Sequence, residues 1–283
     1  MKKVAILFIV LLTSSFLFSQ NTYVPDDKFE QALIDLGYDT TLDDSVVTAN
    51  ISGVTTLDVS NKEISDLTGI EAFTSLIDLD CHNNKLTSLD VSNNTALLQM
   101  NVDKNQLTSL DVSKNTALQH LTLHDNQLTS LDVSNNTALE SLRCYTNQLT
   151  SLDVSNNTAL TDITCSGNKL TTLDVSKNTV LSELAVQSNQ LTSLDVSNNT
   201  ALTTLTCFDN HLTNLDVSAN TALTDIHCWK NFLTSLNVKN GNNTVFVIFN
   251  ASNNPNLTCI EVDDVNYSTT NWNNIDLQTS YSS

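Results

Sequence analysis

Eight leucines stand 21 residues apart without an insertion, at Leu76, Leu97, Leu118, Leu139, Leu160, Leu181, Leu202 and Leu223. The sequence around each of them is nearly the same. A constant period of about 20–29 residues is typical of a solenoid, because so small a unit cannot bury its own apolar side and must stack on its neighbours. The spacing therefore predicts a solenoid whose stacked coils share one continuous apolar interior.

Every coil has the same consensus, which reads L-x-x-L-x-(C/V/L)-x-x-N-x-L-T-S-L-D-V-S-x-N-T-A from its leading leucine. The beginning of this consensus matches the leucine-rich repeat signature L-x-x-L-x-L-x-x-N-x-L. Residues 54–253 therefore resemble the leucine-rich repeat superfamily, and residues 64–73, ISDLTGIEAF, resemble the internalin type of repeat. The resemblance implies a β-rich solenoid domain over 54–253 that winds as a right-handed superhelix. Its concave face, built of a parallel sheet, is expected to bind the partners of the protein.

The alternation of apolar and polar residues predicts two strand-like segments in each coil. In the first segment, Leu121 and Leu123 are expected to point inward, while His120 and His124 point outward. In the second segment, the outward position is occupied by Asp132. We therefore expect a parallel sheet on the concave face and a second, shorter or less regular strand-like face on the convex side.

Two columns of asparagine end the two halves of the coils. The first column is Asn84, Asn105, Asn126, Asn147, Asn168, Asn189, Asn210 and Asn231, and the second is Asn94, Asn115, Asn136, Asn157, Asn178, Asn199 and Asn220. Stacked amides can pair backbone groups that would cost roughly 1–3 kcal/mol each if they were buried alone. Asparagine also tolerates a left-handed backbone, which helps to explain how so many turns need only five glycines. Both columns are therefore interpreted as structural.

Five of the six cysteines share one column, at Cys81, Cys144, Cys165, Cys207 and Cys228. Other coils place valine or leucine there, so the position is an inward-facing apolar site. Neighbouring side chains would run parallel at about 4.8 Å, whereas the β-carbons of a disulfide lie about 3.8 Å apart. The column predicts buried free thiols and no zinc site. Cys259 lies outside the column and has no evident partner.

The amino terminus has the pattern of a secretory signal peptide. Lys2 and Lys3 precede an apolar run over residues 4–18 that is too short for a membrane span, and cleavage is expected near residue 20. We therefore expect an exported protein, secreted or at the cell surface, with no membrane span in its mature form. Removal of the two lysines changes the formal charge from −19 to −21. So acidic a surface repels phosphate backbones, which argues against nucleic acid as a partner.

The two ends of the solenoid depart from the consensus and are expected to be caps. Residues 21–53 predict an N-terminal helical cap with a helix over 25–37. The apolar face of this helix would consist of Phe29, Leu33 and Leu36. Asp26 or Asp27 would be its N-cap, and Gly37 would end it. Residues 254–283 predict a C-terminal cap anchored by Leu257, Ile260, Val262 and Trp272. This arrangement resembles secreted leucine-rich repeat proteins of gliding and gut-type bacteria, many of which carry a sorting domain after such a cap.

The outward positions of the first segment vary from coil to coil, and one column gathers aromatic residues. It reads His82, Asp103, His124, Tyr145, Ser166, Gln187, Phe208 and Trp229. Exposed aromatic and arginine side chains are typical of binding surfaces, since they offer a large contact area at low entropic cost. The coil spacing places Phe208 beside Trp229 and His124 beside Tyr145. The predicted binding residues are His82, His120, His124, Arg143, Tyr145, Phe208, His227 and Trp229; the alternative is unconstrained drift at exposed positions.

The second segment hardly varies, and it supplies the competing site. Its outward aspartate recurs at Asp90, Asp111, Asp132, Asp153, Asp174, Asp195 and Asp216. Such a row could bind calcium through its oxygens, although the sequence lacks the glycine-rich loops of calcium-binding β-rolls, and neighbouring hydroxyls could pair with the acids instead. A nearby rank of threonines resembles those of ice-binding solenoids, but aspartate and serine interrupt it.

These observations favour a non-enzymatic binding module, a monomer that engages a protein through its concave face. Histidines are scattered over the outward positions and no serine or cysteine has a convincing base, so we expect neither catalytic residues nor a cofactor. The alternatives are a glycan-binding or adhesin-type surface protein, and a structural spacer or calcium-stabilised solenoid. The partner itself is not encoded in any motif.

Overall fold

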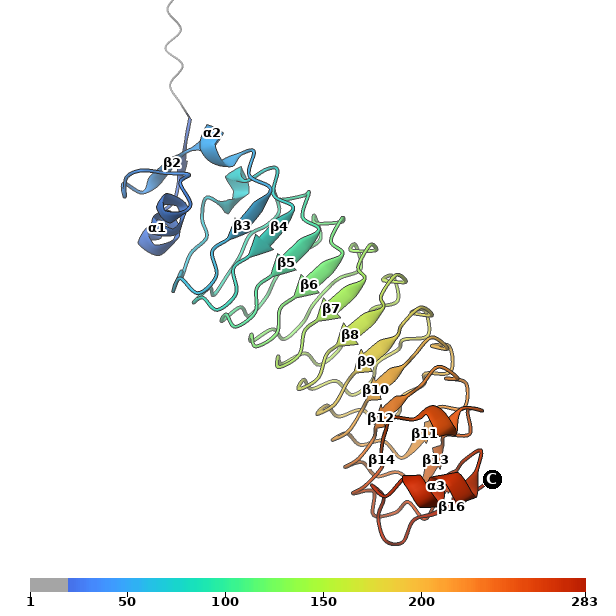
Figure 1. Cartoon of the computed structure of the whole chain (residues 1–283). Helices are drawn as coiled ribbons and strands as arrows, with labels where there is room; N and C mark the ends of the chain where they lie inside the picture. Colours follow the sequence, from blue (N-terminus) through green and yellow to red (C-terminus); the bar gives the residue numbers. More distant parts are fainter. Residues whose placement is uncertain (1–19) are drawn as a thin grey trace, which may run out of the picture.

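The computed structural model describes residues 20–283, so the predicted signal peptide lies outside the described residues except for Gln20. The chain forms an elongated, gently curved rod of stacked coils with a cap at each end (Figure 1). Ten short parallel strands make one sheet along the rod, in the order β14-β12-β10-β9-β8-β7-β6-β5-β4-β3. The strands are β3 Thr56–Asp58, β4 Asp78–Asp80, β5 Gln99–Asn101, β6 His120–Thr122, β7 Ser141–Arg143, β8 Asp162–Thr164, β9 Glu183–Ala185, β10 Thr204–Thr206, β12 Asp225–His227 and β14 Ile248–Asn250. The predicted solenoid is confirmed.

The register of the sheet follows the 21-residue period. Leu142 in β7 pairs with Leu121 on one side and Ile163 on the other, so equivalent residues of successive coils are neighbours in space. All eight leading leucines are fully buried, as are the inward residues of the strands that follow them. The five column cysteines are buried as free thiols, as predicted. Burial raises the pKa of Cys165 and Cys228 to about 12, which keeps these thiols protonated and unreactive.

The opposite face of the rod is less regular, as predicted. A four-stranded sheet is present only toward the carboxyl end, in the order β11-β13-β15-β16. Its strands are β11 Asn214–Asp216, β13 Ser235–Asn237, β15 Cys259–Glu261 and β16 Ser280–Ser282. Nearer the amino end, the bridge between Asp90 and Asp111 is an isolated one. This face is therefore extended backbone that becomes a sheet only near the C-terminal cap.

The two asparagine columns differ in how they are bonded. In the first column, the Asn147 side chain donates to the carbonyls of Leu123 at 3.0 Å and Cys144 at 3.1 Å. Its Oδ1 accepts the N–H of Leu128 at 3.0 Å. In the second column, Asn157 donates to two carbonyls of the preceding coil, but its buried Oδ1 has no hydrogen-bond partner within the described residues. Both columns are structural as predicted, yet only the first uses its donor and its acceptor.

The left-handed conformation predicted for asparagine occurs at Asn61, Asn83 and Asn253, but not at the asparagines of the two columns. Positive φ values fall mostly on the residue just before the first asparagine column, such as Thr146 with φ 52° and Asp125 with φ 52°. Glycine occupies this position only at Gly167, where φ is 61°. The following asparagine donates to the carbonyls two and three residues before it and so clamps the turn. This clamp holds residues of many types in a conformation that they rarely adopt.

The N-terminal cap contains more than the predicted helix. Strands β1 Asn21–Tyr23 and β2 Ser45–Val47 pair antiparallel around helix α1 Asp27–Asp35, and helix α2 Thr48–Ile51 follows. Asp26 is the N-cap, and its Oδ1 accepts the N–H groups of Lys28 and Phe29. Phe29 and Leu33 are buried as expected, but Leu36 is 44% exposed. Leu36 is the C-cap residue, so it has left the helical face that packs on the first coil.

The C-terminal cap is held by aromatic packing. The 3-10 helices η1 Ile70–Ala72 and η2 Asn243–Val245 belong to the first and last coils, and helix α3 Val265–Asn271 crosses the carboxyl end. The ring of Trp272 stacks on Phe249 of β14 at 4.2 Å, and the predicted anchors are all buried. The Cys259 thiol lies 3.0 Å from the Ser282 hydroxyl. Within residues 20–283, no helix has the length and apolar character needed to cross a membrane.

Candidate functional site

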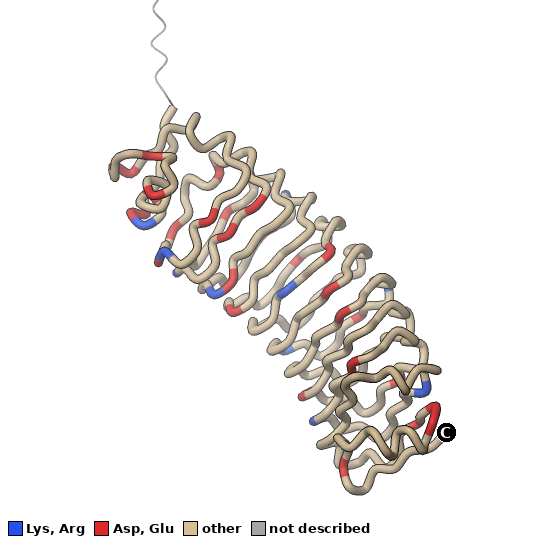
Figure 2. The backbone as a smooth tube through the Cα atoms, viewed as in Figure 1, with Lys and Arg blue, Asp and Glu red and all other residues tan. Residues whose placement is uncertain are grey.

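The outward residues of the ten-stranded sheet form three columns along the rod, which together we call the sheet face. The third column lies two residues beyond the end of each strand and runs from Ser60 to Ser252. All eight predicted binding residues lie on this face, which is the face predicted to be concave. Its seven carboxylates are Asp58, Asp78, Asp80, Asp103, Asp162, Glu183 and Asp225, against one guanidinium at Arg143. Figure 2 shows acidic positions all along the stack, several of them on neighbouring coils at its amino-terminal end.

Two pairs of rings stack in the third column, as predicted. The His124 and Tyr145 rings are 4.1 Å apart with 13° between their planes. The Phe208 and Trp229 rings are 4.3 Å apart with 14° between their planes. These distances are close to the roughly 4.8 Å spacing of parallel strands, so the coil repeat itself sets the stacking. Each pair is therefore positioned by the coil repeat and is partly exposed on the sheet face.

His124 is held between two carboxylates. Its Nε2 lies 2.6 Å from Asp103 and its Nδ1 lies 3.0 Å from Asp125. The Asp103 carboxylate also accepts the backbone N–H of His124 at 3.0 Å. Burial raises the pKa of Asp103 to about 6, although the nearby His124 acts in the opposite direction. The His124–Tyr145 pair thus stands in a negatively charged, partly dehydrated setting.

The other predicted residues are arranged differently. His82 bonds to Asp80 at 2.7 Å, and Arg143 pairs with Asp162 at 3.0 Å. His120 lies near the amino-terminal acids, where it lines a shallow hollow of about 380 Å³ together with Asp78 and Asp80. His227 is half-buried on β12, one coil from Ile248 of β14. The structure therefore places four of the predicted residues in two ring stacks and His82 and His120 in an acidic amino-terminal region, whereas Arg143 and His227 belong to neither group.

One aromatic pair was missed by the sequence analysis. His211 and Phe232 follow the first asparagine column in successive coils, and their rings lie 5.7 Å apart. Phe232 is 50% exposed. The corresponding residues of earlier coils are glutamine or lysine, so comparing this column would have revealed the change. The pair adds a second group of rings to the coils that carry Phe208 and Trp229.

The convex aspartate row is accounted for by hydrogen bonds within each coil. The Oδ1 of Asp132 accepts the backbone N–H of Ser134 at 2.9 Å, and the same bond recurs in each coil of the row at 2.8–2.9 Å. The hydroxyl and N–H of Ser134 lower the pKa of Asp132. The predicted alternative to calcium was pairing with hydroxyls, and the bonds that recur along the row are instead made by the backbone N–H of the serine.

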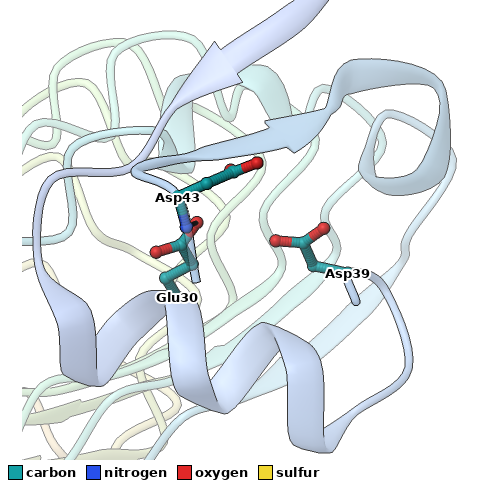
Figure 3. Close-up of side chains that lie close together, drawn as sticks. All are labelled: Glu30, Asp39 and Asp43. Atoms are coloured by element: carbon teal, nitrogen blue, oxygen red, sulfur yellow. Dashed lines mark hydrogen bonds between the residues drawn. The ribbon is translucent and has the colours of Figure 1, made fainter. Parts of the chain in front are cut away.

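A separate group of carboxylates lies in the N-terminal cap. The oxygens of Glu30, Asp39 and Asp43 lie within 4.8 Å of one another (Figure 3). Glu30 is fully buried, and it accepts the N–H groups of Asp43, Asp44 and Ser45 at 2.9–3.1 Å. Three charge-assisted bonds to backbone compensate a buried carboxylate. The group therefore fixes the loop between α1 and β2, and we assign no ion to it.

The fold and the repeated columns define a leucine-rich repeat protein, which is the architecture of a protein-interaction module. Residues 51–157 match the family described as "Endo-beta-N-acetylglucosaminidase EndoS LRR domain". A 77-residue segment is 40% identical to internalin J of Listeria monocytogenes, covering 27% of this chain and 8% of that protein. Over part of its length the chain is thus similar to bacterial leucine-rich repeat proteins of the internalin kind, and it spans 8% of the length of internalin J.

Solved structures agree on the fold. The functional domain of InlJ from Listeria monocytogenes, described as including a cysteine ladder, superposes with a TM-score of 0.53 at 29% identity. That match covers 93% of this chain and 70% of the other. The ectodomain of the Arabidopsis thaliana receptor kinase GASSHO1/SCHENGEN3, in complex with CASPARIAN STRIP INTEGRITY FACTOR 2, matches with a TM-score of 0.64 at 22% identity. It covers 76% of this chain and 28% of the receptor chain, and the likeness concerns the fold alone.

Proposed function

We propose that this chain is an exported, non-enzymatic binding protein whose sheet face engages a protein partner. The observation that carries the proposal is the pair of ring stacks, His124–Tyr145 and Phe208–Trp229, on the sheet face. Rings that are held rigid before binding lose little conformational entropy on contact, so they are suited to be the anchors of an interface. The convex face, by contrast, repeats the same residues from coil to coil.

The histidines support a binding role rather than catalysis. In the described chain, His82 and His124 pair with carboxylates of their own surface, and the cysteines of the neighbouring inward column are buried and protonated. A nucleophile next to a base is the minimum for covalent catalysis, and these pairings use the bases elsewhere. Export is proposed on the basic and apolar pattern of residues 1–20.

The test compares the wild type with the triple variant Y145S/F208S/W229S. Biotinylated protein is incubated with surface proteins of candidate host cells, cross-linked and quantified by mass spectrometry. A matched control, D132N/D153N/D174N, changes three residues of the convex row. We expect a specific partner that the control retains and the triple variant loses, while circular dichroism and melting remain unchanged. If a folded triple variant retains the same partner, the sheet face is not the binding surface.

Glycan binding is the second candidate, because rings of this kind can also stack on sugars. The matching family is described as the repeat domain of an endo-β-N-acetylglucosaminidase, a protein whose name refers to glycans. A glycan array probed with the wild type and with Y145S/F208S/W229S separates the two candidates. Binding to one glycan class that the triple variant loses would favour the glycan-binding function over the protein-binding one. Light scattering would test the expected monomer in the same preparations.

A further inference from the structure

The charge of the sheet face is strongly unbalanced. It carries seven carboxylates and one guanidinium, and that guanidinium, Arg143, already pairs with Asp162 at 3.0 Å. At the amino-terminal end the acids crowd together: burial raises the pKa of Asp78, and the charges of Asp80 and Asp58 add to the effect. A surface with such an excess of carboxylates attracts cationic segments and repels anionic ones.

Each ring stack also has an open end. Stacked rings turn one face toward each neighbouring coil, and within residues 20–283 the ring that stacks on Tyr145 is that of His124, on one of these faces. The next residue in the third column after Tyr145 is Ser166, and the next after Trp229 is Ser252. Serine is too short to cover a ring. The free faces of Tyr145 and Trp229 therefore point into the two places along the column where a further planar group can stack.

Carboxylates stand beside both stacks. Asp103 and Asp125 bind the two ring nitrogens of His124, and their charges add to burial in raising the pKa of Tyr145. At the second stack, Asp209 follows Phe208 and pairs with Lys230 at 2.8 Å. These carboxylates lie on the covered side of each stack, and Asp209 is already paired with Lys230, so the excess charge of the whole sheet face carries the argument. An exposed ring face on such a surface suits a guanidinium, which is planar, stacks on aromatic rings and is attracted by negative charge. A neutral sugar gains nothing from the excess charge.

The two open ring faces also set a distance. Tyr145 and Trp229 occupy the same column four coils apart, which corresponds to about 19 Å at the spacing of parallel strands. An extended chain advances about 3.3 Å per residue, so six residues span this gap. An even number of residues also returns both side chains to the same side of an extended segment.

We propose that the sheet face binds an extended, arginine-bearing segment of a partner protein that runs along the rod. Two arginines six positions apart stack on the free faces of Tyr145 and Trp229, and further basic residues lie along the carboxylates of β3 to β5. This inference rests on the proposed function, because it specifies which protein chemistry the same face recognises.

The probe is a synthetic glycine–serine peptide with two arginines six positions apart, titrated into the full protein at low salt. Binding is read from the fluorescence anisotropy of a dye attached to the peptide, so the wild type, W229S and Y145S are measured in the same way. In the wild type, tryptophan fluorescence gives a second readout at Trp229, because the only other tryptophan, Trp272, is buried against Phe249. We expect saturable binding that W229S and Y145S each weaken by about three- to tenfold, the range of a cation–π contact. A second peptide carries added terminal lysines, and D78N/D80N should weaken its binding about twofold at low salt and by less at high salt. The control variant D153N, on the convex row, should leave the binding of both peptides unchanged.

The control peptides decide the chemistry. Peptides with glutamate in place of arginine, or with the arginines three positions apart, should bind at least threefold more weakly. Equal binding of either control, no saturation with the arginine peptide, or unchanged binding by a folded W229S overturns the proposal. If an identified protein partner is lost in Y145S/F208S/W229S while the arginine peptide does not bind, the arginine specificity fails and the protein-binding function stands. If the partner is retained by that variant, both fail.

Discussion

Replacing one asparagine in each of the two columns by alanine should have very different consequences. Asn147 in the first column supplies the Oδ1 that accepts the buried N–H of Leu128, and its side chain donates to the carbonyls of Leu123 and Cys144. These two carbonyls also accept from Asn126 and Asn168. Asn147→Ala therefore leaves one N–H with no partner, and the carbonyls of Leu123, Cys144 and Tyr145 each lose one donor.

Asn157 in the second column makes fewer indispensable bonds. It donates to the carbonyls of Val133 at 2.9 Å and Asn136 at 2.8 Å. Both carbonyls keep a second donor, the backbone N–H of Asn136 and of Leu139 respectively. The variant Asn157→Ala also removes the unpartnered Oδ1. No buried backbone group is then left without any hydrogen bond.

The free energies follow from these counts. A net hydrogen bond contributes about 1 kcal/mol, and an orphaned buried donor costs about 1–3 kcal/mol. We expect Asn147→Ala to cost about 3–5 kcal/mol of unfolding free energy and Asn157→Ala about 1–2 kcal/mol. The small cavity is common to both changes, so it cancels in the difference of about 2 kcal/mol or more. Because the lost bonds join neighbouring coils, Asn147→Ala should also lower the cooperativity of unfolding.

Urea unfolding followed by circular dichroism measures both quantities, the midpoint and the slope. The pair Asn168→Ala and Asn178→Ala repeats the comparison one coil further on, with the same bonding pattern. Equal costs for the two columns, or a cost of Asn147→Ala below about 1 kcal/mol, would refute the assignment of the first column as the main clamp between coils.

Three further predictions concern single residues. Thr146, with φ 52°, is a β-branched residue in the left-handed region, so Thr146→Gly should raise the unfolding free energy by about 0.5–1 kcal/mol. Asp103 has a pKa of about 6, above its usual value, because it is buried; the folded state thus binds its proton more tightly. As the pH rises from about 4 to 6, the unfolding free energy of the wild type should therefore fall by about 1–3 kcal/mol relative to that of Asp103→Asn. Thermal melts at each pH would detect this change. Cys259 is the one cysteine of the described chain that is not buried, so a thiol reagent should modify only this residue before unfolding and all six after it.

Each of these has a matched control. Gly167→Ala changes the same turn position in the opposite sense, and an added β-carbon would meet nothing closer than 3.5 Å, so its cost isolates the backbone term. A melting difference between wild type and Asp103→Asn that does not vary with pH would contradict the burial of a titrating carboxylate. Rapid labelling of more than one thiol in the native protein would contradict the buried cysteine column.

The 21-residue period determined the middle of the molecule. In a solenoid a residue's neighbours are the residues one period away, so columns read from the sequence are contacts in space. For this reason the stacking of Phe208 on Trp229, the burial of Cys144 and the inward leucines could be predicted. The binding residues were predicted by the same route, and their role awaits the experiments above.

The tertiary structure decided what the period does not encode. The β1–β2 hairpin, the exposure of Leu36 and the three backbone bonds to Glu30 arise in the cap, where packing joins segments without a common repeat. The different bonding of Asn147 and Asn157 depends on which backbone groups face each amide, and the same residue type stands in both columns. Periodicity specifies neighbours, but the direction of each donor and acceptor is set only when the coils are folded against one another.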